Sequence, residues 1–384
     1  MGTSDTAKYN VALIGCGRAG PSRAHTFDLH PLCRVAAVAD TDSENLELAA
    51  GRFGVPGYST YDELYANEQI DIAMAVLPVR PNADAVVASA RAGVKAVFCE
   101  KPLTAMLSEA DRMVEECATR GIPLATGVVV SSHPDYRKAY EMATSGEIGE
   151  VRRINLYEDN GQMGTHGLNL ARKFAGMADV DWVVGWVDGD PHSDYEEDYG
   201  EGTPGYGNIG GYIRFSNGLE CFSSYGEVRW RGIEVVGTRG VIYNSNNTGR
   251  GLHLLKVEGE GQPGPGSTLK EVEGVFEEQT FSPRGHGADG WQSPGEVMPA
   301  IVEDIVNSLE TGADLNVTTG DDMRHALEIA IAMRESHRRD RVPVELPLED
   351  RSLVMYPEKS RWHYKKELMG REAYMAQLAQ QVKA

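Results

Sequence analysis

Apolar residues in the first third of the chain form short continuous runs that alternate with segments of helical periodicity. The runs lie at residues 9–15, 33–40, 70–77, 96–101 and 122–130. Amphipathic segments fall between them, at residues 21–30, 43–54, 82–93 and 107–121. Apolar strands separated by helices are typical of a doubly wound parallel sheet, which is buried on both faces. We therefore predict a doubly wound α/β domain over residues 1–125.

The pattern changes near residue 126. Strand-like runs joined by Gly-bearing turns follow at residues 152–157, 181–189, 211–226, 231–244 and 252–259. Such runs favour an open, mostly antiparallel sheet. Helical periodicity returns at residues 297–310 and 320–338. The second predicted domain is therefore an α/β domain over residues 126–384.

Composition narrows the class of protein. The 384 residues, 41% of them hydrophobic, suit two globular domains. A net charge of −20 argues against nucleic acid as a partner, and no apolar stretch is long enough to predict a membrane span. The five cysteines are scattered, with no C-x-x-C pair, so we expect neither a disulfide framework nor a metal site. A reducing, cytoplasmic location fits best.

The first run leads directly into a G-x-G-x-x-G turn followed by a helix. Gly15 allows the tight turn, Gly17 lets a diphosphate approach the backbone, and Gly20 packs the helix against the strand. The second run ends in Asp40, placed to accept hydrogen bonds from an adenosine ribose, which favours NAD over NADP. The alternative for Asp40 is a turn or helix cap only. The predicted phosphate-binding residues are Gly15, Gly17, Arg18, Ala19 and Gly20.

The fourth run ends in Glu100-Lys101-Pro102. Residues at the carboxyl end of a parallel strand border the crevice where such sheets bind ligands. Taken alone, the tripeptide is equally compatible with a surface ion pair before a helix-starting proline.

Several motifs in combination resemble the Gfo/Idh/MocA oxidoreductases, named after glucose-fructose oxidoreductase and inositol dehydrogenase. They are GCGRAG, Asp40, VLPVRPN, AGVKAVFCEKPL, SGEIGEVRRI, GTHGLNLARKFAG, IRFSNGL and VVGTRGVIY. The resemblance covers residues 9–347. It implies a Rossmann domain, a second domain whose open sheet commonly forms the oligomer interface, and a nicotinamide ring between the domains. It also implies that Lys101 and His166 are catalytic, and that Pro78 and Glu100 border the cofactor.

The chemistry of alcohol oxidation accounts for the two catalytic candidates. A hydride leaves carbon for the nicotinamide while a base takes the hydroxyl proton. His166 can take that proton near neutral pH, and Lys101 can hold the oxygen and stabilise developing alkoxide charge. The alternative for His166 is a structural histidine at a helix start.

The sequence departs from the family pattern at three places. Gln162 stands where many members have an aspartate, and Asn169 stands where an acidic residue is frequent. A glutamine can orient an imidazole but cannot stabilise an imidazolium by charge. The loop at residues 131–133 lacks a frequent arginine and contains His133, which could contact substrate or only shape the turn before a proline. His133, Gln162 and Asn169 are our candidate substrate-binding residues.

These observations predict an NAD-dependent oxidoreductase that acts on a secondary hydroxyl of a sugar, glycoside or inositol. A redox-neutral glycosidase that oxidises a sugar transiently is the first alternative, because Gln162 leaves the usual triad incomplete. A non-catalytic NAD-binding sensor is the second. The resemblance further implies a homo-oligomer, a dimer or tetramer, formed through the sheet of the second domain.

Overall fold

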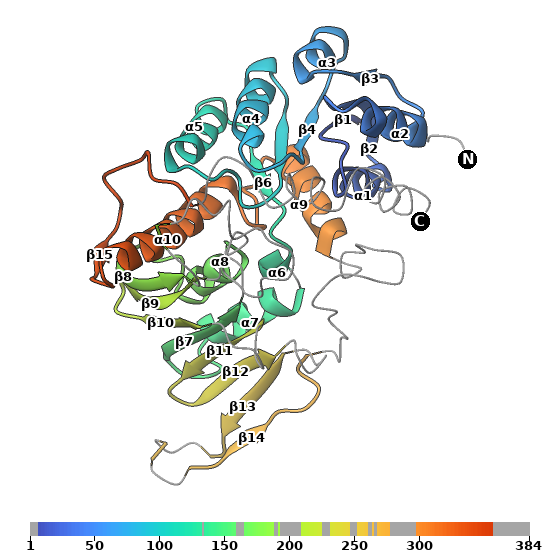
Figure 1. Cartoon of the computed structure of the whole chain (residues 1–384). Helices are drawn as coiled ribbons and strands as arrows, with labels where there is room; N and C mark the ends of the chain where they lie inside the picture. The colour runs from blue at the N-terminus through green and yellow to red at the C-terminus, as the bar shows by residue number, and fades with distance from the viewer. Residues whose placement is uncertain are drawn as a thin grey trace. The chain divides into compact units, whose positions relative to one another are not determined.

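A computed structural model describes residues 7–132, 134–158, 165–187, 191–192, 209–224, 231–245, 252–259, 263–264, 267–276 and 297–355 (Figure 1). These residues divide into two compact units. Unit 1 comprises residues up to 129 together with 297–324, and unit 2 comprises residues 130–276 together with 325–355. Each unit contains its own β-sheet.

The sheet of unit 1 is six-stranded, with the order β3-β2-β1-β4-β5-β6 and parallel pairing throughout. In β1, Val11 and Leu13 belong to the core on one face, whereas Ala12 and Ile14 belong to cores on the other. The predicted doubly wound fold is therefore confirmed. The strands are β1 (Tyr9–Ile14), β2 (Cys33–Ala39), β3 (Gly57–Tyr58), β4 (Ile72–Ala75), β5 (Ala96–Cys99) and β6 (Leu124–Thr126).

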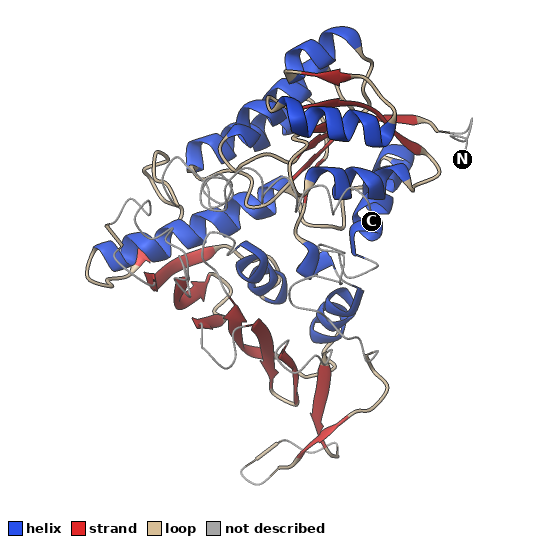
Figure 2. Cartoon of the chain, turned by 45° about the vertical axis from the view of Figure 1, so that its right-hand side comes forward, coloured by secondary structure: helices blue, strands red, loops and turns tan. Residues whose placement is uncertain are grey.

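Helices cover both faces of this sheet (Figure 2). Side chains of α1, α2 and α9 contribute to the core on one face, and those of α3, α4 and α5 to the cores on the other. Asp42 caps α2 by accepting bonds from the first-turn N–H groups. Helix α4 ends in a left-handed cap at Gly93, with φ of 83°. The helices are α1 (Gly20–Asp28), α2 (Ser43–Phe53), α3 (Tyr61–Asn67), α4 (Pro81–Ala92), α5 (Leu107–Ala118) and α9 (Val297–Thr311).

Helix α9 belongs to unit 1, although it follows most of unit 2 in the sequence. Ile301 and Ile305 are fully buried in the core that also contains Val11 and Leu13. Glu310, near the end of α9, accepts a hydrogen bond from Lys8 Nζ at 2.6 Å. The predicted contiguous second domain over residues 126–384 is therefore wrong, because an amphipathic stripe shows that a helix packs but not against which sheet.

The boundary near residue 126 also differs in detail. The predicted strand at residues 122–130 is shorter, because β6 ends at Thr126 and α6 (Val129–Ser132) begins three residues later. The backbone N–H of Thr126 donates to Thr318 O at 3.0 Å. The edge strand of the sheet is thereby covered by the segment that joins α9 to α10 (Gly320–Arg338).

The sheet of unit 2 is nine-stranded, with the order β14-β13-β12-β11-β7-β10-β9-β8-β15. Among its described pairs only β10 and β7 are parallel, which confirms the predicted mostly antiparallel sheet. The strands are β7 (Val151–Glu158), β8 (Val180–Val187), β9 (Ile209–Phe215), β10 (Glu220–Ser224), β11 (Arg231–Gly237), β12 (Gly240–Ser245), β13 (His253–Val257), β14 (Leu269–Glu271) and β15 (Val344–Glu345).

The two faces of this sheet differ. One face packs against helices, and the approach is so close that a Cβ on Gly185 would lie 2.4 Å from the Cβ of Met333 in α10. The other face carries partly exposed aromatic rings. Trp182 is stacked on Tyr212 with the ring centroids 5.3 Å apart, and Phe222 is 44% exposed. The remaining helices of the unit are α7 (Pro134–Thr144) and α8 (Thr165–Phe174). The predicted open sheet face is therefore present.

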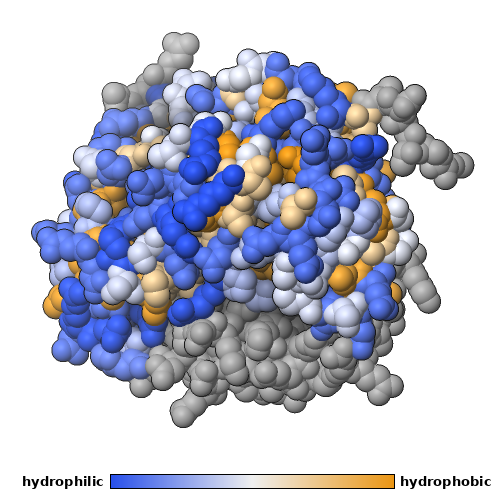
Figure 3. Space-filling model, turned by 90° about the horizontal axis from the view of Figure 1, so that it is seen from above, coloured by the Kyte–Doolittle hydropathy of each residue, from blue (hydrophilic) through white to orange (hydrophobic). Residues whose placement is uncertain are grey.

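The face seen in Figure 3 is predominantly hydrophilic, with small, scattered hydrophobic areas. Among the described residues, every helix is too short or too polar to span a bilayer.

If α9 completes the core of unit 1, removing a buried side chain from it will destabilise that unit. We expect Ile301→Ala to lower the free energy of unfolding by about 2–5 kcal/mol, because a fully buried isoleucine leaves a cavity. The matched control is Asn307→Ala, an exposed position on the same helix, with an expected change of about 0.5 kcal/mol or less. Urea unfolding measures both. Equal effects of the two variants would contradict the assignment of α9.

Candidate functional site

The turn between β1 and α1 can only be built from glycine at two positions. Gly15 has φ of 99°, and a Cβ there would lie 2.3 Å from Val76 O. A Cβ on Gly20 would lie 2.0 Å from the carbonyl oxygen of Gly15. Both approaches are far shorter than van der Waals contact, so the chain folds back tightly and brings the start of α1 against the end of β1.

The start of α1 is suited to an anion. Its N-cap residue, Ala19, has no side chain that could accept a hydrogen bond from the first helical turn. The first N–H groups of a helix lack intrahelical partners and carry a partial positive charge. Gly17, Arg18 and Ala19 are partly exposed and Gly20 is buried. The predicted phosphate-binding residues therefore lie together, and their backbone fits a diphosphate.

Asp40 follows β2 and contacts the same turn. Its Oδ2 accepts a hydrogen bond from the Cys16 N–H at 2.7 Å, and its Oδ1 accepts one from the Asp42 N–H at 2.8 Å. The turn-stabilising role considered for Asp40 is thus present. Each carboxylate oxygen has a second lone pair, so the side chain can also accept bonds from ribose hydroxyl groups. Burial and the charge of Asp40 raise the pKa of the Cys16 thiol, so that the thiol stays protonated at neutral pH.

The residues that follow β4 and β5 lie at the same edge of the sheet. The backbone N–H of Val76 donates to Ile14 O at 2.9 Å, and that of Glu100 donates to Ala75 O at 3.0 Å. Pro78, in the loop after β4, is exposed, and Lys101, after β5, is partly exposed. The sheet therefore brings together the Gly-rich turn, Asp40, Pro78, Glu100 and Lys101, as the sequence predicts.

Glu100 has a strong partner that sequence reasoning missed. Its Oε1 accepts a hydrogen bond from Arg23 Nε at 2.6 Å, and both residues are less than 10% exposed. Arg23 lies in the first turns of α1. The only signal for this pair is that a buried arginine or glutamate requires an opposite charge, which does not identify the partner.

The candidate residues of unit 2 that the structure describes lie on α8. His166 and Asn169 are three residues apart and therefore share one face of that helix. Asn169 is fully buried, and its Nδ2 donates to Ser131 Oγ, in α6, at 3.1 Å. The imidazole Nδ1 of His166 is buried as well. The candidate Asn169 thus joins α8 to α6 through Ser131.

Two predicted substrate-binding residues, His133 and Gln162, lie outside the described residues. The described part of the chain contains no cluster of three or more His, Cys, Asp or Glu side chains arranged to bind a metal ion.

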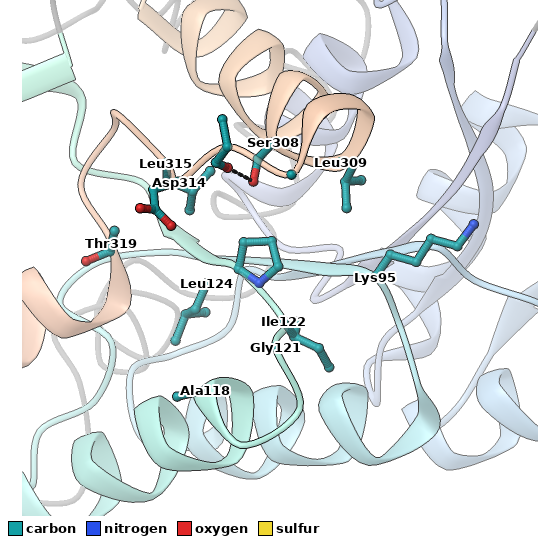
Figure 4. A pocket seen from close by; sticks show the side chains of 13 residues that line it. Lys95, Ala118, Gly121, Ile122, Leu124, Ser308, Leu309, Asp314, Leu315 and Thr319 are labelled. Carbon is teal, nitrogen blue, oxygen red and sulfur yellow. Dashed lines mark hydrogen bonds between the residues drawn. The ribbon is translucent and has the colours of Figure 1, made fainter.

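A cavity of about 530 Å³ lies at the opposite edge of the unit 1 sheet, where β6 begins (Figure 4). Leu124 lines it from β6, and Pro123 lines it just before that strand. Leu309 and Leu315 line it from the end of α9 and the turn that follows. Lys95, just before β5, also borders it. None of the predicted site residues lies along this cavity, so it is separate from the edge that carries the Gly-rich turn.

Residues 9–128 match the GFO_IDH_MocA family model, described as an oxidoreductase family with an NAD-binding Rossmann fold. The Rossmann domain of this chain is therefore similar to that of the Gfo/Idh/MocA oxidoreductases. The resemblance seen in the motifs and the predicted nicotinamide cofactor are both confirmed by this match.

Similar proteins include the myo-inositol 2-dehydrogenase of Thermotoga maritima, which is 29% identical over 147 residues, or 38% of this chain and 44% of that protein. The 2,7-anhydro-N-acetylneuraminate hydratase of Mediterraneibacter gnavus is 28% identical over 140 residues, or 36% of this chain and 37% of that protein. The aligned segments thus span less than half of these relatives.

Solved structures extend the similarity over both units. A levoglucosan dehydrogenase in complex with NADH and levoglucosan has a TM-score of 0.69 and 19% identity, and the match covers 88% of this chain and 100% of that chain. At this identity the match shows a shared fold. The predicted two-part α/β architecture is therefore confirmed.

The glycine requirement of the turn leads to a matched pair of variants. We expect Gly20→Ala to raise the Kd of NAD+ by about tenfold or more, because displacing Gly15 costs about 1–3 kcal/mol. Gly51→Ala, in α2, has nothing within 4 Å of the added Cβ and should leave the Kd unchanged. Isothermal titration calorimetry measures both constants. Tight NAD+ binding by Gly20→Ala would show that this turn does not bind the diphosphate.

Proposed function

We propose that this protein is an NAD-dependent oxidoreductase that oxidises a secondary hydroxyl of a sugar, glycoside or inositol. One observation carries the proposal. Lys101 follows a strand whose carboxyl end lies at the same sheet edge as the Gly-rich turn of an NAD-binding domain. The similar proteins include an inositol dehydrogenase and a levoglucosan dehydrogenase, which supports a polyhydroxy compound as substrate.

Each group of cofactor-binding residues would contact a different part of NAD. The backbone of Gly15, Gly17 and Gly20 and the N-terminus of α1 bind the diphosphate. Asp40 accepts bonds from the adenosine ribose and repels a 2′-phosphate, which favours NAD over NADP. Pro78 and Glu100 border the nicotinamide end.

The chemical step needs an acceptor for the hydride, which NAD+ supplies when bound. The substrate hydroxyl loses its proton to the imidazole of His166, because histidine is the side chain suited to accept a proton near neutral pH. The ammonium group of Lys101 holds the same oxygen and stabilises its developing negative charge. Asn169, three residues after His166 on α8, connects that helix to Ser131 of α6 by a hydrogen bond.

A redox-neutral reaction is the second candidate, favoured by the similarity to a hydratase of an anhydro sugar and by Gln162 in place of an aspartate. In that reaction a sugar carbon is oxidised transiently, which acidifies the neighbouring C–H so that a bond can be eliminated. Water would then add across the resulting double bond, and the hydride would return to the oxidised carbon. NADH does not accumulate in this case, whereas a dehydrogenase forms NADH in step with its product.

We also propose that the protein forms a homo-oligomer, a dimer or tetramer, through the open face of the unit 2 sheet. This face carries two aromatic pairs. The rings of Trp186 and Phe222 are tilted, with centroids 6.2 Å apart, and those of Trp182 and Tyr212 are stacked. Protein interfaces commonly bury aromatic surfaces of this kind.

Lys101→Met tests the proposed reaction most directly. The parent protein should convert at least one member of a panel of free sugars, inositols and aryl glycosides, followed by NADH absorbance and aglycone release together. We expect Lys101→Met to lower kcat by about 100-fold or more, because alkoxide stabilisation is lost. Lys95→Met, at the other end of β5, is the matched control and should keep the parent rate. Parent-like turnover by Lys101→Met would refute the role of Lys101.

His166→Ala tests the proton transfer. We expect the rate to fall by about 100-fold or more, and the limb of the pH profile near the histidine pKa to disappear. His253→Ala, in β13, removes a histidine that pairs with Glu271 and should leave both unchanged. A full pH–rate profile of each variant is the measurement. If His166→Ala keeps the parent profile, another group moves the proton.

A further inference from the structure

The short segment from Glu100 to Leu103, which carries Lys101, is held by buried side chains from two helices. Leu103 is fully buried with φ of 70°, a left-handed conformation that leucine rarely adopts. Such a conformation persists only where the surroundings enforce it. Arg23 from α1 contacts the start of this segment, and Asn82 from α4 contacts its end.

The contacts of Arg23 confine the carboxylate of Glu100. Arg23 Nε donates to Glu100 Oε1 at 2.6 Å, and the N–H of Lys101 donates to Glu100 Oε2 at 3.3 Å. The backbone of Gly127 closes the remaining side, since a Cβ there would lie 2.6 Å from Oε2. The carboxylate therefore links the guanidinium of α1 to the backbone of Lys101.

Asn82 fixes the other end of the segment. Its Nδ2 donates to Leu103 O at 3.0 Å, and its Oδ1 accepts from the Leu77 N–H at 3.2 Å. Asn82 is fully buried, so these bonds are shielded from competition with water. The loops that follow β4 and β5 are thus joined through one side chain.

A stabilising role alone does not account for the Arg23–Glu100 pair. Taking two charges out of water costs about as much as their attraction returns, and apolar residues of similar volume are often equally stable. What the pair adds is a defined position. Arg23 lies three residues after Gly20, so the helix that begins at the Gly-rich turn is tied directly to the peptide of Lys101.

We propose that Arg23 is a positioning residue, which holds Lys101 in register with the Gly-rich turn through the carboxylate of Glu100. The inference rests on the proposed role of Lys101. Arg23 acts on the backbone of Lys101, and Asn82 secures the far end of the same segment. A shift of about 1 Å in a catalytic group can lower a rate by about 100-fold, so small changes at Arg23 should be visible.

The first test needs no substrate. In protein labelled with a nitrogen isotope only in lysine, the backbone amide signal of Lys101 is identified by its absence in Lys101→Arg. We expect this signal to shift or broaden in Arg23→Met and, to a smaller extent, in Arg23→Lys, which keeps the charge but lacks the planar donor group. The control is Arg91→Met, which breaks an exposed Arg–Glu pair between α4 and Glu116 and should leave the signal in place.

The second test separates positioning from binding. With any substrate that the parent turns over, we expect Arg23→Lys to lower kcat by about 10-fold or more while the Kd of NAD+ changes by about threefold or less. Arg91→Met should match the parent in both. If Arg23→Met does not fold, Arg23→Lys and Glu100→Gln provide the same comparison.

The outcomes distinguish this inference from the proposed function. A folded Arg23 variant whose Lys101 amide signal and kcat both equal those of the parent would overturn the positioning role, whatever the reaction is. A parent protein that binds no NAD+, or a fully active Lys101→Met, would instead overturn the proposed function. The amide measurement would still show whether Arg23 positions the backbone of Lys101.

Discussion

Parallel pairing is the constraint on which the candidate site depends. Because every strand of unit 1 runs in the same direction, the residues that follow β1, β2, β4 and β5 emerge at one edge despite their distance in sequence. Backbone hydrogen bonds from Gly15, Val76 and Glu100 to the ends of neighbouring strands fix their relative positions. Backbone hydrogen bonds therefore determine where the site residues lie, and their side chains extend from a rigid backbone.

Charge at this edge is balanced locally. Asp40 receives two backbone N–H groups, and Glu100 receives a guanidinium and a backbone N–H. In a medium of low dielectric constant an uncompensated carboxylate would take up a proton or open the structure to water. The same partners that neutralise these groups also restrict their orientation. Electrostatic balance and geometric precision thus come from one set of contacts.

The sequence contained enough to predict five of the six parallel strands, the glycine turn and the acidic residue that contacts it, because these depend on local periodicity and on backbone space. Strand β3 has only two residues and leaves no periodic signal. The partner of Glu100 and the contact between Ser131 and Asn169 depend on which helices meet in space. Periodicity shows which face of α9 is apolar, but it cannot show that this face belongs to the first sheet.

The late position of α9 in the sequence has a consequence for biosynthesis. A ribosome releases the strands of the nucleotide-binding unit first, but the helix that seals one side of that sheet leaves the exit tunnel only after most of the other unit. The roughly 170 residues between β6 and α9 take about 10–35 s to synthesise at ordinary elongation rates, and the apolar surface stays unsealed for that time. During that interval the exposed surface would be a binding site for chaperones that recognise hydrophobic segments. An isolated N-terminal fragment would retain that liability permanently.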